Sequence, residues 1–265
     1  MSARVISSRE NPQYKQIRQL ATSAQARRKA GMTLLDGVHL CEAWLQHKGA
    51  PAVCVAGENE RGNPEVQKVV AQCEQLGADC VWLPETLFAP LSQVEHGVAL
   101  LFVVATPSTG QQPKLDGAAL LLDGLQDPGN LGSILRTAAA AGIPRVYCGN
   151  GTVSAWSPKV LRAGMGAHFV IDIVEDADLE RLVADAGVPV YATSSHASQS
   201  IHQADLAAPS AWMFGHEGKG VSDRLLAAAT ATLTIPQAPQ VESLNVAASV
   251  AVCLFEQLRQ QRAAR

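Results

Sequence analysis

The chain has 265 residues, of which 47% are hydrophobic and 17% charged, with a formal net charge of −3 and a pI near 6.2. This composition excludes a disordered chain, and the whole-chain charge argues against a protein that is strongly attracted to nucleic acid. The longest apolar run, 98–105, is far shorter than the about 20 residues that span a bilayer.

The first thirty residues have the opposite charge to the rest. They carry a net charge of +6 and leave −9 for residues 31–265. Since a polyanion responds to charge within about 8–10 Å, this segment is a candidate RNA or DNA contact, with a solvated basic helix face as the alternative. One acid, Glu10, stands among seven basic residues: Arg4 and the six proposed RNA-binding residues Arg9, Lys15, Arg18, Arg27, Arg28 and Lys29.

Residues 1–105 alternate between helical and strand-like segments, which predicts a small α/β domain. The predicted helices are 11–21, 38–49 and 64–77, and the predicted strands are 32–37, 51–57, 78–84 and 97–105. Residues 106–117, with two prolines, two glycines and no apolar periodicity, are expected to be a linker.

The alternation restarts at residue 118 and predicts a second domain over 118–265. Such alternation predicts an α/β fold with a mostly parallel sheet, whose ligands bind in the loops that follow the strands. Strands are expected at 118–124, 145–149, 168–174, 188–194, 211–215 and 232–236, and helices at 131–142, 177–187, 222–230 and about 243–262.

Cysteine usage and the N-terminal sequence indicate a cytoplasmic protein. The N-terminus lacks the apolar core of a signal peptide, and no membrane partner is expected. The cysteines form no C-x-x-C pair, so we expect reduced, buried thiols and no metal site: Cys41, Cys54, Cys73, Cys80, Cys148 and Cys253.

The first of three candidate loops, DGLQDPGN at 123–130, joins a strand to a helix. Asn130 is expected to cap that helix. Arg136 projects from its second turn, away from the apolar stripe, where it could hold a phosphate. A plain cap and a solvated arginine explain the same residues without a ligand.

The other two loops also follow predicted strands. FGHEGKG at 214–220 has three glycines that allow the backbone to approach a ligand closely, with Glu217 among them. IPQAPQVESLN at 235–245 ends in Ser243 and Asn245, which can cap the last helix or bind a ligand at its N-terminus. A tight turn and simple capping are the alternatives.

Together the three loops resemble the signature motifs of the SpoU (TrmH-like) family of RNA ribose 2′-O-methyltransferases. The matching segments are DGLQDPGNLGSILRTAAAAGI, MFGHEGKGVSD and IPQAPQVESLNVAASVAVCLFEQL. ISSRENPQYKQIRQL and LLDGVHLCEAWL resemble the small substrate-binding domain of many rRNA-directed members. Two residues depart from the pattern: Asp36, where glutamate is expected, and His216, where a smaller polar residue is commoner.

The resemblance implies a SPOUT-type fold with a deep trefoil knot, S-adenosylmethionine as cofactor, and a homodimer whose active site is completed across the interface. The family pattern assigns cofactor contacts, largely through backbone groups, to Gly215, Ile235 and Leu244. It assigns the polar catalytic site to Asn130, Arg136, Glu217, Ser243 and Asn245.

Methyl transfer to a ribose hydroxyl requires alignment of the oxygen and removal of its proton. An arginine guanidinium stays protonated at neutral pH, so we expect Arg136 to anchor RNA and stabilise a developing alkoxide rather than act as the base. Glu217 is expected to shape the second loop or orient Arg136. Ribosomal RNA is favoured as substrate. The alternatives are tRNA, a non-catalytic RNA-binding or assembly factor, and an antibiotic-resistance methylase.

Overall fold

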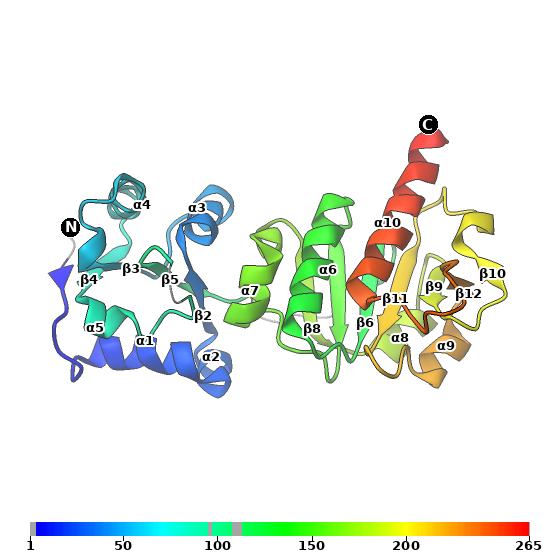
Figure 1. The fold of residues 1–265 in the computed structure, drawn as a ribbon, viewed down its shortest axis with the longest axis horizontal. Coiled ribbons are helices and arrows are strands. Elements are labelled where there is room, and N and C mark those ends of the chain that lie inside the picture. The colour runs from blue at the N-terminus through cyan, green and yellow to red at the C-terminus, as the bar shows by residue number, and fades with distance from the viewer. Residues whose placement is uncertain (1–3, 95–96, 108–112, 265) are drawn as a thin grey trace. The chain divides into compact units, whose positions relative to one another are not determined.

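The computed structural model describes residues 4–94, 97–107 and 113–264 (Figure 1). Its contacts divide the chain into one unit of Met1–Ser108 with Trp156–Phe169 and a second of Thr109–Ala155 with Val170–Arg265. The sequence pattern groups residues 156–169 with the second domain, whereas their contacts are with the first unit. Within the expected linker, residues 108–112 lie outside the described part.

The first unit is built on a five-stranded mixed sheet of order β1-β4-β3-β5-β2. Helices α3 and α4 cover one face, and α1 and α5 the other (Figure 1). The elements are β1 (Arg4–Val5), α1 (Pro12–Thr22), α2 (Ala24–Ala30), β2 (Met32–Asp36), α3 (Val38–His47), β3 (Val53–Gly57), η1 (Glu58–Glu60), α4 (Pro64–Gln75), β4 (Asp79–Leu83), α5 (Glu85–Phe88), β5 (Leu100–Ala105), α7 (Pro158–Gly164) and η2 (Ala167–Phe169).

Helix α7 packs against strand β2 inside the first unit. The Thr33 hydroxyl, fully buried, donates to the Trp156 carbonyl oxygen at 2.7 Å. Trp44 of α3 meets Phe169 edge to face, with ring centroids 5.3 Å apart. These contacts hold residues 156–169 within the first unit, because aromatic packing and a satisfied buried hydroxyl both stabilise it.

The second unit contains a seven-stranded, all-parallel sheet of order β10-β12-β9-β11-β6-β7-β8. The predicted α/β fold with a mostly parallel sheet is confirmed. Its elements are β6 (Ala119–Asp123), α6 (Pro128–Ala140), β7 (Arg145–Gly149), β8 (Asp172–Ala177), α8 (Leu179–Ala184), β9 (Val190–Thr193), β10 (Gln199–Ser200), η3 (Ile201–Gln203), β11 (Ala211–Gly215), α9 (Asp223–Ala228), β12 (Ala231–Thr234) and α10 (Val246–Ala263).

Alternation along the strands divides the second unit's core between two helical layers. Leu121 and Met213, which are register partners, belong to the cluster that contains Leu179 of α8 and Leu225 of α9. Successive strand residues point to opposite faces, so Trp212 faces α10, where its indole nitrogen donates to Gln257. Helices α6 and α10 pack together on that side (Figure 1).

One predicted strand begins later than expected. The apolar run at 168–174 predicted a strand, but His168 and Phe169 belong to η2, and β8 begins at Asp172. Both aromatic rings are buried in the first unit, so tertiary packing overrides their strand propensity.

All six cysteines are free and buried, as the sequence predicts. Burial raises the pKa of Cys253 to about 12, so that thiol is inert at neutral pH. Among the described residues, no group of three or more histidine, cysteine or acidic side chains is arranged to hold a metal. Within the same part of the chain, no helix combines the length and apolarity needed to cross a membrane.

Candidate active site

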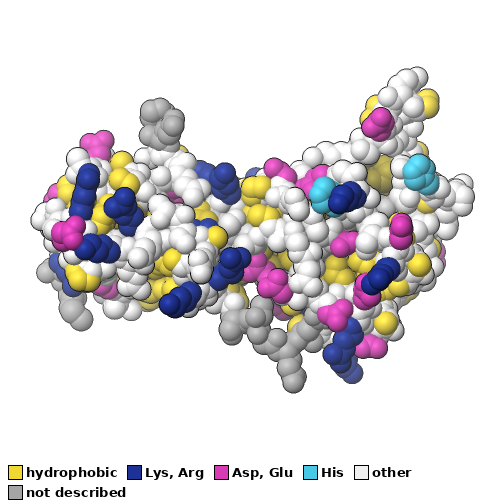
Figure 2. All heavy atoms as spheres, turned by 90° about the horizontal axis from the view of Figure 1, so that it is seen from below, with side chains coloured by type: hydrophobic (Ala, Val, Ile, Leu, Met, Phe, Trp, Pro, Cys, Tyr) yellow, Lys and Arg dark blue, Asp and Glu magenta, His cyan; other side chains and the backbone are white. Residues whose placement is uncertain are grey.

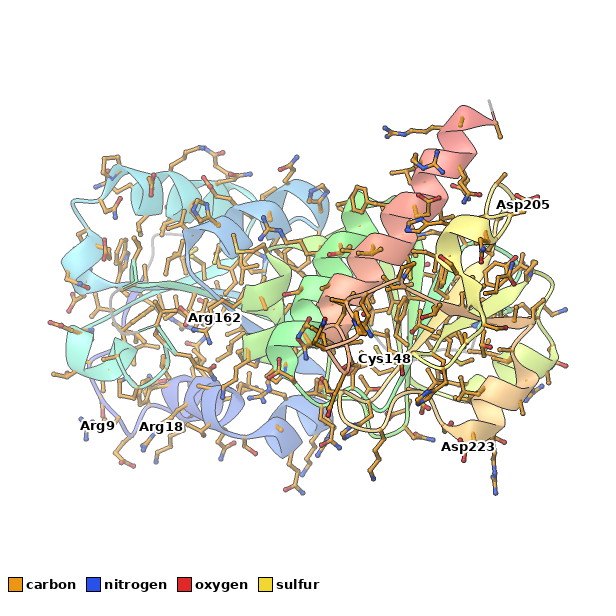
Figure 3. The ribbon with its side chains drawn as sticks, turned by 45° about the vertical axis from the view of Figure 1, so that its right-hand side comes forward. Arg9, Arg18, Cys148, Arg162, Asp205 and Asp223 are labelled. Carbon is orange, nitrogen blue, oxygen red and sulfur yellow. The ribbon has the colours of Figure 1, made fainter. Side chains whose placement is uncertain are left out.

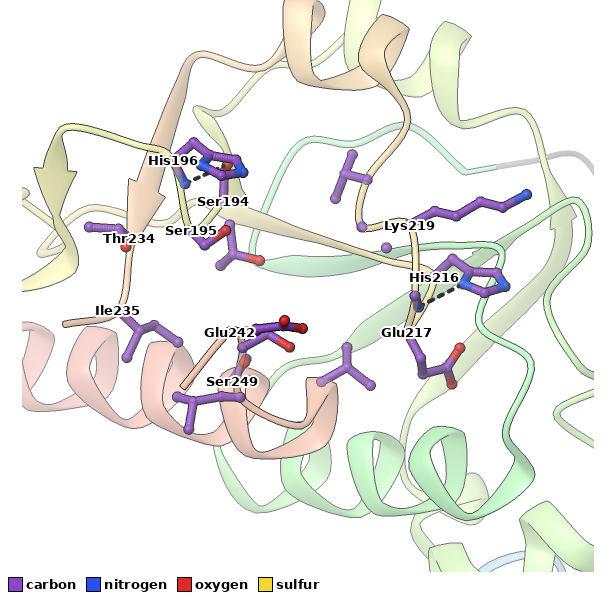
Figure 4. A pocket seen from close by; sticks show the side chains of 18 of the residues that line it. Ser194, Ser195, His196, His216, Glu217, Lys219, Thr234, Ile235, Glu242 and Ser249 are labelled. Atoms are coloured by element: carbon purple, nitrogen blue, oxygen red, sulfur yellow. Dashed lines mark hydrogen bonds between the residues drawn. The ribbon is translucent and has the colours of Figure 1, made fainter. Parts of the chain in front are cut away.

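A cavity of about 690 Å³ lies at the carboxyl ends of β9, β11 and β12 (Figure 4). It is lined by residues 193–196 after β9, 215–221 after β11, and 242–246 before α10, with Ile235 after β12. The second and third candidate loops therefore meet in one place. The loop at 193–196 was missed, although its position after a predicted strand and its polar sequence, TSSH, were available signals.

The loop after β11 folds back on its own first residue. A Cβ added to Gly215 would lie 2.0 Å from the Gly220 carbonyl carbon, so only glycine fits. The Gly220 amide donates to the His216 carbonyl oxygen at 2.7 Å, and Gly220 has a φ of +72°. The predicted need for glycine here thus has a steric cause, the close approach of two backbone segments.

Glu217 joins this loop to the N-terminus of α6. Its carboxylate accepts hydrogen bonds from the Gln126 amide at 3.3 Å, the Asp127 amide at 3.1 Å and Asn130 Nδ2 at 3.1 Å. Partial burial acts to raise the pKa of Glu217, but the bonds from Asn130 and the backbone amides outweigh it and lower that pKa below its ordinary value. Glu217 therefore remains ionised and shapes the second loop.

Asn130 does not cap α6, which corrects the prediction from sequence. The cap is Asp127, whose carboxylate accepts from the Asn130 amide at 2.7 Å, and the helix begins at Pro128. Proline favours the first helical position because it needs no amide donor there and its φ suits a helix. The DPGN segment is thus the first helical turn, which leaves the Asn130 side chain available for the site.

Asn245 connects Asn130 to the last helix. Its Nδ2 donates to Asn130 Oδ1 at 3.0 Å, while its Oδ1 caps α10 by accepting from the amides of Ala247 at 2.9 Å and Ala248 at 3.3 Å. Glu217, Asn130 and Asn245 therefore form a polar chain, a series of hydrogen-bonded side chains from three loops that are far apart in sequence. Of the two functions that the sequence left open, the structure shows that Asn245 caps α10.

The cavity is also lined by three further residues that the sequence predicted: Ser243, Leu244 and Ile235. Ser243 is exposed and precedes the cap residue, so it is not the cap of α10. The Leu244 side chain is 38% exposed, a large value for an apolar residue. An apolar side chain at the rim of a polar cavity is suited to contact a ligand that has both apolar and polar parts.

Arg136 lies apart from these residues. It is exposed on α6, does not line the cavity, and forms no hydrogen bond or ion pair with any residue that the structure describes. In particular, the carboxylate contacts of Glu217 are with Asn130, Gln126 and Asp127 and not with Arg136. The guanidinium of Arg136 is therefore available to contact another molecule.

Seen from its α1 and α2 side, the first unit presents a group of lysine and arginine side chains (Figure 2). Arg9 and Arg18 project outward there (Figure 3), and Arg28 and Lys29 are exposed. Lys15 is paired with Glu10.

Arg27 differs from its basic neighbours. It is half-buried and donates to the Leu20 carbonyl oxygen at 2.7 Å, and burial followed by the nearby Arg28 lowers its pKa. It has a structural contact that its neighbours lack.

Several known proteins match this chain over nearly its whole length. The chain is 38% identical to an uncharacterized tRNA/rRNA methyltransferase of Synechocystis, covering 98% of this chain and 95% of the relative. It is 32% identical to the 23S rRNA (guanosine(2553)-2′-O)-methyltransferase RlmP of Bacillus subtilis, covering 94% and 97%. A solved AdoMet-bound rRNA methyltransferase from Sinorhizobium meliloti superposes with a TM-score of 0.83 at 28% identity, covering 96% and 97%.

The family model described as the SpoU rRNA methylase family matches residues 117–255. That range contains all three motif loops, both ends of the polar chain and the cavity. The chain therefore belongs to the SpoU rRNA methylase family.

Proposed function

We propose that this protein transfers a methyl group from S-adenosylmethionine to a ribose 2′-hydroxyl of ribosomal RNA. The observation that carries the proposal is that the second and third motif loops meet around one cavity, while Asn130 of the first motif is hydrogen-bonded to both of them through the polar chain. The names of full-length relatives support the same chemistry, because one is a 23S rRNA 2′-O-methyltransferase and a structural neighbour is AdoMet-bound.

The residues at the cavity fit S-adenosylmethionine. Its volume of about 690 Å³ lies in the range for small-molecule sites, and its walls combine glycine backbone with polar and apolar side chains. Gly215, Ile235 and Leu244 would hold the cofactor, which supplies a methyl group activated by a sulfonium. The segment 235–245 meets the loops at 193–196 and 215–221, an arrangement that supports the trefoil knot expected of the family.

The polar chain is suited to orient substrate at the edge of this cavity. Asn130 and Asn245 hold each other's amide groups in one orientation, and Ser243 offers an exposed hydroxyl beside them. We assign these three groups to alignment of the ribose, because hydroxyl and amide groups can both donate and accept hydrogen bonds. Glu217 is assigned to holding the chain in place.

Arg136 is assigned to the active site of a second subunit. Its guanidinium is exposed and outside its own chain's cavity. On the neighbouring helix α10, Val252 and Phe255 are 38% and 47% exposed, which is unusual for large apolar side chains. A homodimer that covers this apolar surface would bring Arg136 of one subunit to the RNA bound at the other.

Mixing two inactive variants tests this arrangement. Arg136→Ala should abolish methylation with nearly unchanged cofactor affinity, and Gly215→Ala should abolish cofactor binding. If the arginine acts across the interface, unfolded and co-refolded mixtures should regain about a quarter of wild-type activity, because half of the dimers contain one complete site. No recovery, with mixed dimers shown by native mass spectrometry, would place Arg136 in its own subunit's site.

Methylation of total RNA with labelled cofactor tests the function directly. RNA from cells that lack this protein is used, and the label is located after alkaline hydrolysis. A 2′-O-methyl group blocks cleavage, since the 2′-hydroxyl is the attacking group, so we expect labelled alkali-stable dinucleotides from ribosomal RNA. Label in alkali-labile mononucleotides would contradict ribose methylation. Label in tRNA instead of ribosomal RNA would identify tRNA as the substrate.

A further inference from the structure

His216 stands in the glycine loop, directly after Gly215 at the end of β11. Its ring nitrogen Nδ1 accepts a hydrogen bond from the Gly218 amide at 2.9 Å, the dashed line at His216 in Figure 4. The His216 carbonyl oxygen also accepts from the amides of Lys219 at 3.3 Å and Gly220 at 2.7 Å. Both the side chain and the backbone of His216 therefore close the turn from 216 to 220.

Only a neutral imidazole can make the side-chain bond. Nδ1 accepts when the ring proton is on Nε2, whereas a protonated ring presents an N–H at both nitrogens and would point one at the Gly218 amide. Protonation thus replaces the hydrogen bond from the Gly218 amide to Nδ1 by an unfavourable contact between two N–H donors. Histidine side chains ordinarily change charge between about pH 5 and 8.

The charged and titratable groups around His216 come from its own loop, from the adjoining β6–α6 turn and from the cavity wall. Lys219 and Glu217 flank His216 on its own loop (Figure 4). The adjoining β6–α6 turn presents Asp123, which accepts from the Ser222 amide at 2.9 Å, and Asp127, the cap of α6. The other ionisable side chains that line the cavity are Asp223, Glu242 and His196. Carboxyl and ammonium groups ordinarily titrate below and above the range from pH 5.5 to 7.5.

We propose that His216 is a positioning residue of the cofactor loop, and that its neutral ring holds the loop in the form that binds S-adenosylmethionine. The inference rests on the proposed cofactor site, because Gly215 directly precedes this turn and Gly220 ends it. Loss of the Gly218 contact lowers the fraction of molecules with a formed loop, and apparent affinity falls with that fraction. Protonation of the His216 ring therefore lowers cofactor affinity.

Calorimetric titration with S-adenosylmethionine at pH 5.5, 6.5 and 7.5 tests the proposal. Wild-type affinity should fall by about three- to tenfold from pH 7.5 to 5.5, the ratio expected for one net hydrogen bond. His216→Asn keeps an acceptor oxygen at the equivalent place without a titrating group, so its affinity should stay constant. His216→Ala should bind weakly at every pH, and His196→Asn should retain the wild-type pH dependence.

Several outcomes would overturn the assignment: wild-type affinity independent of pH, His216→Asn with the wild-type pH dependence, or His216→Ala with wild-type affinity at pH 7.5. Gly215→Ala tests the underlying site separately, because normal binding by that variant would reject the cofactor site itself. If a His216 variant fails to fold, NMR of the wild type decides: the Gly218 amide signal must shift along the His216 titration curve, and an unchanged signal rejects the contact.

Discussion

At the scale of single residues, the polar chain is oriented by one carboxylate. An ionised carboxylate only accepts hydrogen bonds, so Asn130 must turn its amide nitrogen toward Glu217 and its oxygen toward Asn245. Asn245 then donates through its own nitrogen, which leaves its oxygen to cap α10. The charge of Glu217 thereby determines the direction of two amide groups and connects three motif loops.

Replacing Glu217 by glutamine tests this orientation. In this variant one carboxylate oxygen becomes an amide nitrogen, which would oppose either the Gln126 amide or the donors at Asp127 and Asn130. We therefore expect the methylation rate to fall at least about tenfold. Glu242→Gln is the matched control, since that carboxylate lines the same cavity but makes no hydrogen bond with a described residue. Equal loss in the two variants would contradict the role of Glu217.

The same residue predicts an acid dependence of loop order. Because hydrogen bonds lower the pKa of Glu217 in the folded protein, its stabilising contribution is fully present above the ordinary value of 4.5. The contribution is lost as the pH falls through the lowered folded-state pKa. Hydrogen exchange of the Gln126 and Asp127 amides should accelerate there, relative to other amides, in the wild type but not in Glu217→Gln.

Two glycines in one loop should respond differently to the same substitution. A Cβ at Gly215 would collide with the Gly220 backbone, whereas one at Gly218 would lie 3.7 Å from the His216 ring, an ordinary contact. We expect Gly215→Ala to abolish cofactor binding and Gly218→Ala to bind within about twofold of wild type. Titration calorimetry of both variants measures the difference, and similar affinities would show that the fold-back is not needed.

At the scale of elements, α10 is held to the sheet by a buried amide. Gln257, 3% exposed, accepts from the Trp212 indole nitrogen at 2.7 Å and donates to the Ser210 hydroxyl at 2.8 Å. Gln260 adds a bond from the Leu206 amide at 2.9 Å. These contacts determine which face of the helix meets the sheet, and they leave Asn245 at its N-terminus beside Asn130.

Gln257→Leu should destabilise the protein although leucine is apolar and of similar size. The Trp212 nitrogen would be left buried without a partner, at a cost of about 1–3 kcal/mol in the free energy of unfolding. Urea unfolding followed by tryptophan fluorescence measures this change. The control is Gln261→Leu on the same helix, where the glutamine side chain makes no hydrogen bond with a described residue. A stability loss no greater than that of the control would show that the Trp212 bond contributes little.

At the scale of the whole molecule, the small net charge conceals a division between the first thirty residues and the rest of the chain. Arg28 and Lys29 are exposed on the α2 side of the first unit, while Lys48 and Lys68 belong to the α3–α4 side of its sheet (Figure 1). If RNA binds the α1–α2 side, a change in charge at Arg28 and Lys29 must affect RNA binding more than an equal change at Lys48 and Lys68. Arg27 is omitted from the comparison because of its bond to Leu20.

Reversal of charge at Arg28 and Lys29 should weaken RNA binding and flatten its salt dependence. The slope in question is that of log affinity against log salt concentration. Each lost phosphate contact reduces its magnitude by roughly 0.9 on a duplex, or by roughly 0.7 on a single strand. The Lys48→Glu, Lys68→Glu double variant should retain the wild-type slope. Filter binding over a range of salt concentrations measures both, and equal slopes for the two variants would reject a contact on the α1–α2 side.

The sequence by itself determined the α/β class, most elements and the three loops, because apolar periodicity and turn residues are local properties. It also identified glycine at 215 and the polar residues at 217, 243 and 245, but it placed Asn130 at a cap that Asp127 occupies. Only the tertiary structure decided the return of 156–169 to the first unit, the cavity wall at 193–196 and the order of donors from Asn245 to Glu217. These depend on contacts between segments separated by tens of residues, and no local pattern encodes which distant group satisfies a given hydrogen bond or buries a given ring.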